Sequence, residues 1–564
     1  MKKTTLWNTI VSYNIHLLFL LALLLVIIRQ PLLQVVCSFP SIDAGSRFYF
    51  PIEFLINVCI TVFWSYIAFR TVLNTRYTEL TGRMLSKDKH DFHKSYSELS
   101  YFFTHNNPYQ MDIDSLPIED WQDADGVILC KYEDPDGNYR LVKRESAGKG
   151  NLIAFGLPGS GKTTTQAATT AARFNAENGA CGVFAISIKG DLLNFVRGRR
   201  TNILLFTPDK EDGSCHYDPL YGVAYMDPTE RRTFVENMSV IICPEEQGEN
   251  AAFFYNGARD YFCAVMLYLL YLHDTGQRAG QLKFPEFVDE ILSGNVFDIT
   301  ITIRDSGCRM AGEYSNAYEG SSEKNTAGIW NHLCKCVRPF NTGALRTLFD
   351  GEGHCITPED LNHADVYIDV PQEKYQVYSK AMALITTNFI QAFMRRPDVS
   401  SQQDTVPILF LLDEAVQINL DFSLLSQAMS TLRSKNVSIF LLMQSIAQLE
   451  GRYGNSHARE IIDLCAYISV FNAQDPQSRE YFQKLVGRRK MLQKSASSNN
   501  AGEKNESSGI TVNEVDEYIF EAADFGDLNT VDDDGNVVYR VLVYANGKYI
   551  LGETTPVMRD TFKG

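Results

Sequence analysis

Two long apolar runs near the N-terminus dominate the hydrophobic pattern of the chain. The first covers residues 10–28 and is interrupted by polar side chains only near its start, and the second covers residues 52–69 with Glu53 at its edge. Each run is just long enough to cross a bilayer core of about 30 Å at about 1.5 Å per residue. The pattern therefore predicts a two-span membrane anchor within residues 1–72.

The charges around these runs predict their orientation. Lys2 and Lys3 precede the first run. More basic residues follow the second run than lie in the short intervening loop, residues 29–51. By the positive-inside rule both ends face the cytoplasm, which holds the bulk of the chain. A cleaved signal peptide is the alternative for the first run. The absence of a small-residue cleavage site and the presence of a second run argue against it.

Beyond residue 73 the pattern changes to short apolar runs alternating with helical segments. The apolar runs lie at residues 182–188, 203–208, 366–370, 408–412, 438–443 and 467–471. This rhythm is typical of a doubly wound, mostly parallel sheet with helices on both faces. We therefore assign residues 73–223 and 344–564 to one α/β domain.

The strand rhythm stops between residues 224 and 343, where the pattern is helical, as in the amphipathic stretch 256–273. We expect an all-α domain inserted between two strands of the sheet. Its aromatic residues are interpreted as core, with a binding surface as the alternative. These residues are Tyr255, Phe262, Tyr268 and Tyr271.

The C-terminal part contains a predicted flexible loop and a predicted hairpin. Residues 494–508 are rich in Ser, Asn, Gly and Lys, a composition that indicates a mobile segment. Residues 537–544 and 548–553 read as two strands joined by the Asn-Gly turn at 546–547.

Composition limits the partners. The 564-residue chain has a net charge of −16 and a pI near 5.2, which argues against a broad basic surface. If nucleic acid is the substrate, the positive charge must be gathered locally. The twelve cysteines include a single close pair, Cys334 and Cys336, and no zinc-ligand spacing. They are typical of reduced thiols in a cytosolic body.

A glycine-rich motif supplies the first chemistry. GLPGSGKT, residues 156–163, follows an apolar run and enters Ala-rich, helix-compatible sequence, as a phosphate-binding loop does. Its glycines allow backbone N–H groups to curl round the phosphates of ATP. We expect Lys162 to reach the β- and γ-phosphates and the Thr163 hydroxyl to ligate Mg²⁺. The predicted nucleotide-binding residues are Gly156, Pro158, Gly159, Ser160, Gly161, Lys162, Thr163 and Thr164.

Two carboxylates at the end of an apolar run complete the expected site. PILFLLDEA, residues 407–415, places Asp413 to hold the Mg²⁺ shell and Glu414 to orient or deprotonate the attacking water. An ordinary helix start is the alternative, because acidic residues favour that position. The phosphate-binding loop upstream favours catalysis.

Two further polar residues carry catalytic hypotheses. Gln444 follows the run SIFLLM and is expected to sense the γ-phosphate, with a strand-end cap as the alternative. In TLRSK, Arg433 and Lys435 end a helix, where cations are favourable in any case. The other reading of Arg433 is an arginine finger reaching the nucleotide of a neighbouring subunit.

The order of these parts resembles the coupling-protein ATPases of type IV secretion and bacterial conjugation. The resemblance covers roughly residues 10–490 and rests on these motifs: GLPGSGKT, ISIKGDL, HYDPL, LLDEAVQI, TLRSKNVSIFLLMQSIAQLEGRYG and AQDPQSREYFQKLVG. It implies a RecA-like fold, a bacterial inner-membrane anchor and a hexameric ring round a channel. It also implies ATP-driven passage of single-stranded DNA, with its relaxase and relaxosome proteins, towards secretion-channel proteins.

The chain departs from the family pattern in two places. By the resemblance, Lys189, Gly190 and Asp191 lie near the nucleotide, but Ser187 and Ile188 precede them where the family more often has DPKG. The acidic stretch 514–534 stands where a basic segment is more usual.

The densest basic features of the catalytic part are candidate DNA contacts. They are Arg452, Arg459, Arg488, Arg489 and Lys490, with Tyr453 as a base-stacking side chain. Such residues would bind single strands without sequence preference and with strong salt dependence. A solvated charge cluster is the alternative.

Three functions follow from these expectations. The leading one is a membrane-anchored ATPase that transfers conjugative DNA. The second keeps the motor and makes proteins the main cargo, and the third is a substrate receptor whose nucleotide site serves assembly. A chromosome-handling translocase fits less well, because it does not ordinarily combine the helical insertion with the motif at residues 444–454.

Overall fold

The computed structural model describes residues 109–112, 126–133, 139–144 and 150–559, apart from short gaps at 177–178, 189–190, 247, 249, 319, 400–404, 500–506 and 533. Both predicted membrane runs, at 10–28 and 52–69, lie outside the described residues. Among the helices within these ranges, none combines the length and the apolar character that crossing a bilayer requires.

One large sheet forms the centre of the α/β domain. Its strand order is β2-β1-β14-β13-β9-β3-β8-β7-β4-β6-β5, with β12 beside β13. The strands from β9 to β5 run parallel. In sheet order they are β9 (Cys465–Val470), β3 (Asn151–Phe155), β8 (Val437–Met443), β7 (Ile408–Leu412), β4 (Val183–Ile188), β6 (Asp365–Val370) and β5 (Ile203–Phe206). All six apolar runs that the sequence marked as strands are therefore confirmed.

Antiparallel strands extend the sheet beyond β9. They are β13 (Val537–Ala545), β14 (Lys548–Thr554), β1 (Val127–Glu133), β2 (Tyr139–Arg144) and the short β12 (Thr530–Val531). The predicted C-terminal hairpin is confirmed, because Asn546 and Gly547 take the positive φ angles of 51° and 77° that a tight turn between twisted strands needs. The C-terminal hairpin thus returns to its own sheet, where it lies between β9 and β1.

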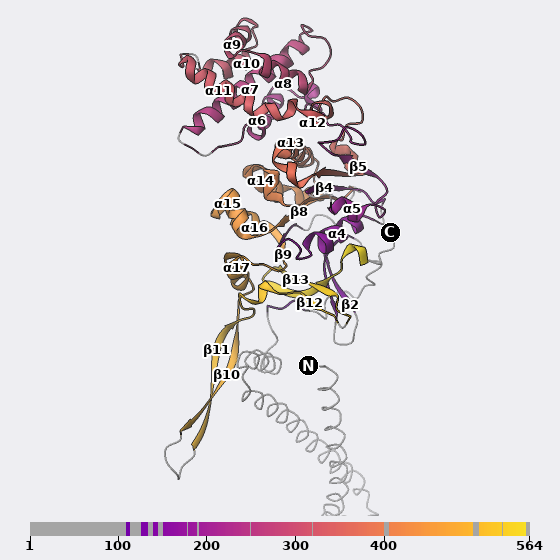
Figure 1. Cartoon of the computed structure of the whole chain (residues 1–564), viewed down its shortest axis with the longest axis vertical. Helices are drawn as coiled ribbons and strands as arrows, with labels where there is room; N and C mark the ends of the chain where they lie inside the picture. The colour runs from indigo at the N-terminus through magenta and orange to yellow at the C-terminus, as the bar shows by residue number, and fades with distance from the viewer. Residues whose placement is uncertain are drawn as a thin grey trace, which may run out of the picture. The chain divides into compact units, whose positions relative to one another are not determined.

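Helices cover both faces of the parallel part, as Figure 1 shows. Leu152 and Ala154 of β3 face one apolar layer, and Ile153 and Phe155 face the other, as the two-residue period of a strand requires. The first layer contains the π-helical turn η3 (Lys162–Ala167), α4 (Ala168–Arg173) and α5 (Asp191–Val196). The second contains α13 (Tyr375–Met394), α14 (Phe422–Thr431), α15 (Ile446–Tyr453), α16 (Asn455–Asp463) and α17 (Pro476–Val486). The expected doubly wound fold is confirmed.

The described residues between β5 and β6 form helices and no strand. The main helices are α6 (Pro228–Ile242), α7 (Ala251–Asp274), α8 (Phe284–Ser293), α9 (Val296–Asp305), α10 (Arg309–Ser315), α11 (Glu323–Val337) and α12 (Gly343–Leu348). Phe262 and Tyr268 are buried, whereas Tyr255 and Tyr271 are half-buried. The core interpretation therefore holds for the first two, and Tyr255 lies under the guanidinium of Arg259 at 4.9 Å.

The predicted loop at residues 494–508 is wrong at both ends. Residues 494–499 continue β10 (Arg488–Asn499), and residues 507–508 begin β11 (Ser507–Tyr518), its partner in a two-stranded sheet. Residues 500–506 lie outside the described part. The Ser-rich composition gave no apolar alternation, but strand pairing rests on backbone hydrogen bonds, which composition does not report.

Candidate nucleotide site

The glycine motif begins where β3 ends, at the carboxyl edge of the parallel strands. Gly156 N–H donates to the Met443 carbonyl at the end of β8 at 3.1 Å, and Leu157 N–H donates to the Asn472 carbonyl just after β9 at 3.0 Å. Both neighbouring strands therefore fix the loop. This edge is where open α/β sheets bind ligands.

Each glycine of the motif has its own geometric reason. Gly159 and Gly161 have φ angles of 80° and 102°, in the region that side chains rarely adopt. A Cβ on Gly156 would lie 2.7 Å from Cβ of Phe471, and a Cβ on Gly161 would lie 2.4 Å from Cδ1 of Tyr539. The loop can keep this curled shape only with glycine at these positions.

Gly161→Ala is therefore expected to weaken nucleotide binding. Strain of about 1–3 kcal/mol at a left-handed residue corresponds to a loss of roughly 5- to 150-fold in affinity. Titration with a fluorescent ATP analogue measures the loss. Gly451→Ala is the matched control, because a Cβ there meets open space and its φ is not positive. Unchanged affinity in Gly161→Ala would show that the loop does not hold phosphates.

Three of the predicted catalytic side chains meet beside the loop. Nζ of Lys162 lies 3.8 Å from Oε1 of Glu414, and both residues are buried. Nε2 of Gln444 donates to the same Glu414 oxygen at 2.8 Å. Nε2 of Gln448 in turn donates to Oε1 of Gln444 at 3.0 Å, so the hydrogen-bonded chain continues into helix α15.

The two predicted metal ligands lie on the elements that enclose this cluster. Asp413 follows β7 and is buried, and its Oδ1 accepts a hydrogen bond from the Glu414 N–H at 3.1 Å. Glu414 has a φ of 48°, a strained value that turns the chain sharply after the strand. Thr163 is half-buried in the first turn of η3. Carboxylate and hydroxyl oxygens are the ligands that Mg²⁺ prefers.

The remaining loop residues differ in what they offer. Pro158 and Gly159 form an exposed tip. Thr164 turns its hydroxyl towards the Gly161 carbonyl at 3.4 Å. Ser160 is buried, and its Oγ has no hydrogen-bond partner among the described residues. A buried hydroxyl without a partner beside a glycine cradle fits a phosphate oxygen.

Arg433 is not brought to this site. It is exposed on the short helix η10 (Leu432–Lys435), which precedes β8, whereas the glycine loop follows the carboxyl end of the neighbouring parallel strand β3. The seven residues of β8 separate these edges by about 20 Å. Its neighbour Lys435 forms an ion pair with Asp398 at 2.8 Å. Within one chain, Arg433 does not reach the glycine loop.

The other predicted contacts are scattered. Lys189 and Gly190 lie outside the described residues, and Asp191 opens α5 directly after β4. The Arg452 guanidinium lies 5.4 Å from the Tyr453 ring, and Arg459 is exposed. The predicted basic group at 488–490 contains Arg488, whose guanidinium lies 4.1 Å from the Tyr518 ring, and the exposed Lys490.

Three residues of this site escaped the sequence reasoning. Tyr539 of β13 packs its ring against Gly161, and the Asn472 carbonyl holds the loop. Neither has a signal in the sequence, since each approaches from a distant strand. Gln448 could have been found, because it follows Gln444 by four residues at a helix start and such residues share a helix face.

A glycine loop after one parallel strand, facing an Asp-Glu pair at the end of another, defines a phosphate-loop nucleotide-binding α/β protein. Residues 122–519 match the family model described as type IV secretory system conjugative DNA transfer. The chain belongs to this family. No curated protein matches it.

Solved structures of a conjugative coupling protein share the fold. Unbound TrwB is 13% identical with a TM-score of 0.57, over 75% of this chain and 89% of that one. TrwB with the ATP analogue ADPNP is 13% identical with a TM-score of 0.55, over 74% and 87% of the two chains. TrwB with ADP and Mg²⁺ is 13% identical with a TM-score of 0.54, over 75% and 90%. The RecA-like α/β architecture is therefore common to both proteins.

Proposed function

We propose that the chain is a membrane-anchored coupling ATPase that recruits relaxase-bound single-stranded DNA and drives its transfer into a type IV secretion channel. It acts at the bacterial inner membrane, with two spans near its N-terminus, its bulk in the cytoplasm and six copies in a ring. The observation that carries the proposal is the cluster of the buried Lys162 and Glu414 with the half-buried Gln444 beside the glycine loop. Family membership supplies the DNA-transfer context.

The residues divide the work of hydrolysis between them. Bound Mg²⁺ would neutralise charge on the β- and γ-phosphates, held by Thr163 and Asp413. Lys162 contacts the phosphates, and Glu414 orients the attacking water and takes its proton. Gln444 changes partner from Glu414 to the γ-phosphate. Gln448 of helix α15 is hydrogen-bonded to Gln444, so a movement of Gln444 is transmitted to α15 and away from the nucleotide site.

ATP turnover of the purified full chain, compared without nucleic acid, with single-stranded DNA and with duplex DNA, tests this function. We expect single-stranded DNA to raise turnover several-fold. The stimulation should fall steeply as salt rises, because Lys and Arg contacts to phosphate release counterions. Turnover that ignores DNA, or stimulation that salt does not weaken, would contradict the DNA-motor function.

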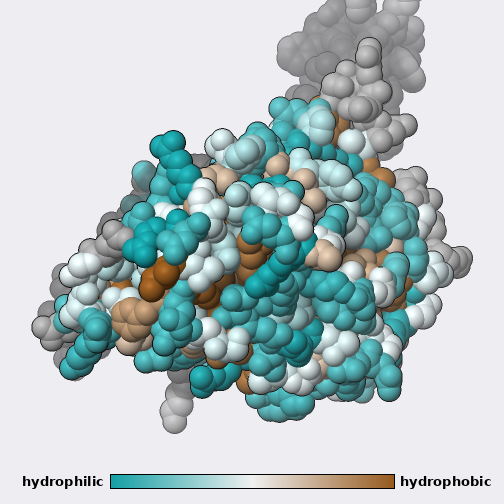
Figure 2. Space-filling model, turned by 90° about the horizontal axis from the view of Figure 1, so that it is seen from above, coloured by the Kyte–Doolittle hydropathy of each residue, from teal (hydrophilic) through white to brown (hydrophobic). Residues whose placement is uncertain are grey.

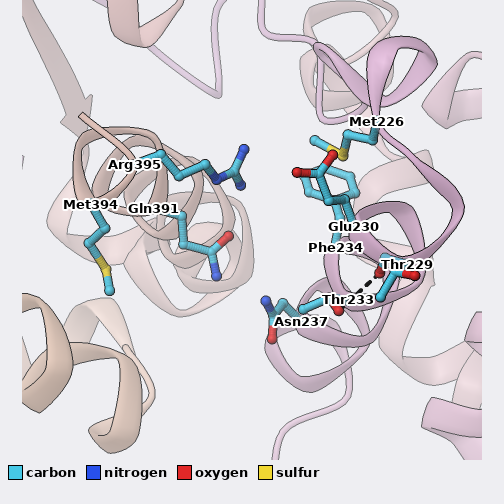
Figure 3. A pocket seen from close by; sticks show the side chains of 9 residues that line it. All are labelled: Met226, Thr229, Glu230, Thr233, Phe234, Asn237, Gln391, Met394 and Arg395. Carbon is cyan, nitrogen blue, oxygen red and sulfur yellow. Dashed lines mark hydrogen bonds between the residues drawn. The ribbon is translucent and has the colours of Figure 1, made fainter. Parts of the chain in front are cut away.

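Protein cargo is the second candidate, and a pocket favours it. A pocket of about 360 Å³ lies between α6 of the insertion and the end of α13, with Met226, Phe234 and Met394 in its lining. Figure 3 shows Arg395 pointing across it towards Glu230. Methionine-lined pockets adapt to varied apolar side chains, as a peptide-binding site requires. The face of the molecule shown in Figure 2 is mainly hydrophilic and carries a few hydrophobic patches.

A further inference from the structure

A second pocket lies where the insertion meets the α/β domain. Its volume is about 410 Å³, and none of the glycine-loop residues lines it. The insertion contributes the end of α6 and Arg259 of α7. The α/β domain contributes Thr387 of α13, the start of α14, the end of α15 and the start of α16. This pocket is therefore separate from the nucleotide site described above.

Aromatic rings form one wall of this pocket. The rings of Phe422 and His457 stack with centroids 3.7 Å apart and planes 12° apart. Tyr453 stands beside them, with its ring 6.3 Å from Phe422. His457 is exposed and Phe422 is half-buried, so the stack is accessible from the pocket side. Accessible flat rings are what a nucleobase needs, because every base has a face that can stack.

Two arginines complete the binding chemistry. Arg452 lies 5.4 Å from the Tyr453 ring. Arg259 lies over the Tyr255 ring, and its Nε donates to the Cys243 carbonyl at 2.8 Å. In the described part of the chain, neither guanidinium forms an ion pair with a carboxylate. The hydrogen bond holds Arg259 in place, and both guanidinium groups keep N–H donors for a phosphate.

Carboxylates in the lining mean that negative charge alone is not enough for a ligand to bind in this pocket. Glu245 and Asp421 both line it, and Asp421 is committed to capping α14, where its Oδ1 accepts from the Leu424 N–H at 3.0 Å. A free anion would gain little in such a mixed field. A ligand that stacks on the rings and also places a phosphate at the arginines gains from both.

A buried hydroxyl points to the same kind of ligand. Thr387 is 2% exposed and lines the pocket, and its Oγ1 has no hydrogen-bond partner among the described residues. An unpaired buried hydroxyl costs free energy unless a polar group reaches it. The polar edge of a nucleobase or a sugar oxygen supplies such a group.

We propose that this pocket binds a nucleotide of single-stranded nucleic acid, with the base on the Phe422–His457 stack and the backbone phosphate at Arg452 and Arg259. The proposal rests on the proposed function and names where its DNA is held. Helix α15 gives the pocket a role in the motor. It starts beside Gln444 at the nucleotide site and ends with Arg452 and Tyr453, about 12 Å further on.

Binding of fluorescent oligo-dT by the detergent-purified full chain, loaded with a non-hydrolysable ATP analogue, tests the pocket by fluorescence anisotropy. Phe422→Ala should weaken binding about tenfold, since stacking of one base is worth about 1–3 kcal/mol. Arg452→Ala should also weaken it and lower the salt slope by about 1. Matched controls are Phe297→Ala and Arg309→Ala, both at exposed positions of the insertion. Neither control should change affinity.

The outcomes separate the pocket from the motor. If Phe422→Ala fails to fold, His457→Ala replaces it, because that side chain is exposed. Wild-type affinity in the pocket variants, with DNA-stimulated turnover intact, overturns the pocket and leaves the proposed function standing. Turnover of the wild-type chain that ignores single-stranded DNA overturns the proposed function. Equal losses in the two controls would show non-specific binding and overturn the pocket.

Discussion

Replacing Glu414 by Gln is expected to stop ATP turnover and leave ATP bound. The amide keeps an oxygen that can accept the Gln444 hydrogen bond, now 2.8 Å long, so the buried cluster retains its shape. It cannot take a proton from water, and loss of a general base typically lowers the rate by about 10²- to 10⁴-fold. Single-turnover hydrolysis and an equilibrium ATP titration on the same preparation measure the two effects separately.

Glu373→Gln provides the matched control, because Glu373 is an exposed carboxylate on the short helix before α13. It should change neither quantity. Near-normal turnover in Glu414→Gln would mean that another base acts, and Asp413 would be the next residue to test. Loss of ATP binding would instead show that Glu414 mainly balances the charge of Lys162, 3.8 Å away.

Most of the fold was accessible from the sequence for a simple physical reason. A parallel strand covered by helices on both faces must be apolar throughout, and β7 and β8 are buried along their whole length. Such apolar runs are easily recognised in the sequence. The β10 and β11 pair was missed because its residues carry no comparable apolar signal.

The residues of the candidate site also differ in how far the sequence could predict them. Gly161, Lys162 and Glu414 lie in motifs whose chemistry requires those residues at those spacings. The contact of Tyr539 with Gly161, by contrast, depends on how β13 joins the sheet beside β9. Sequence patterns report what a segment needs locally, and they do not report which distant segment reaches it.

The pocket between the insertion and the α/β domain also depends on contacts that sequence patterns do not report. The sequence marked Arg452 and Tyr453 as basic and aromatic but gave them no partner from the insertion. Arg259 reaches the same pocket because the insertion, which lies between β5 and β6 in the chain, packs against α13 through α6. Under the proposed pocket, α15 would link the nucleotide site to the site that holds DNA.

The second large effect concerns Arg433. Arg433→Ala is expected to lower turnover of the assembled protein by about 10³-fold or more, the usual worth of an arginine finger, while ATP binding stays near normal. The reason is positional, since Arg433 lies at the edge of the sheet opposite its own glycine loop and is exposed there. An arginine finger at this position would act only on the nucleotide of another copy. Turnover and ATP affinity of the variant are measured side by side.

Mixing variants decides between the two readings of Arg433. Lys162→Ala subunits lack a working loop but keep Arg433, and Arg433→Ala subunits keep the loop. Co-assembly should restore part of the turnover that each variant lacks alone, because some interfaces then combine an intact loop with an intact arginine. Arg433→Lys should remain weak, since an ammonium lacks the planar fork that suits phosphoryl charge. No recovery on mixing, or full activity of Arg433→Lys, would show that Arg433 acts only as a cation that stabilises the C-terminal end of its helix.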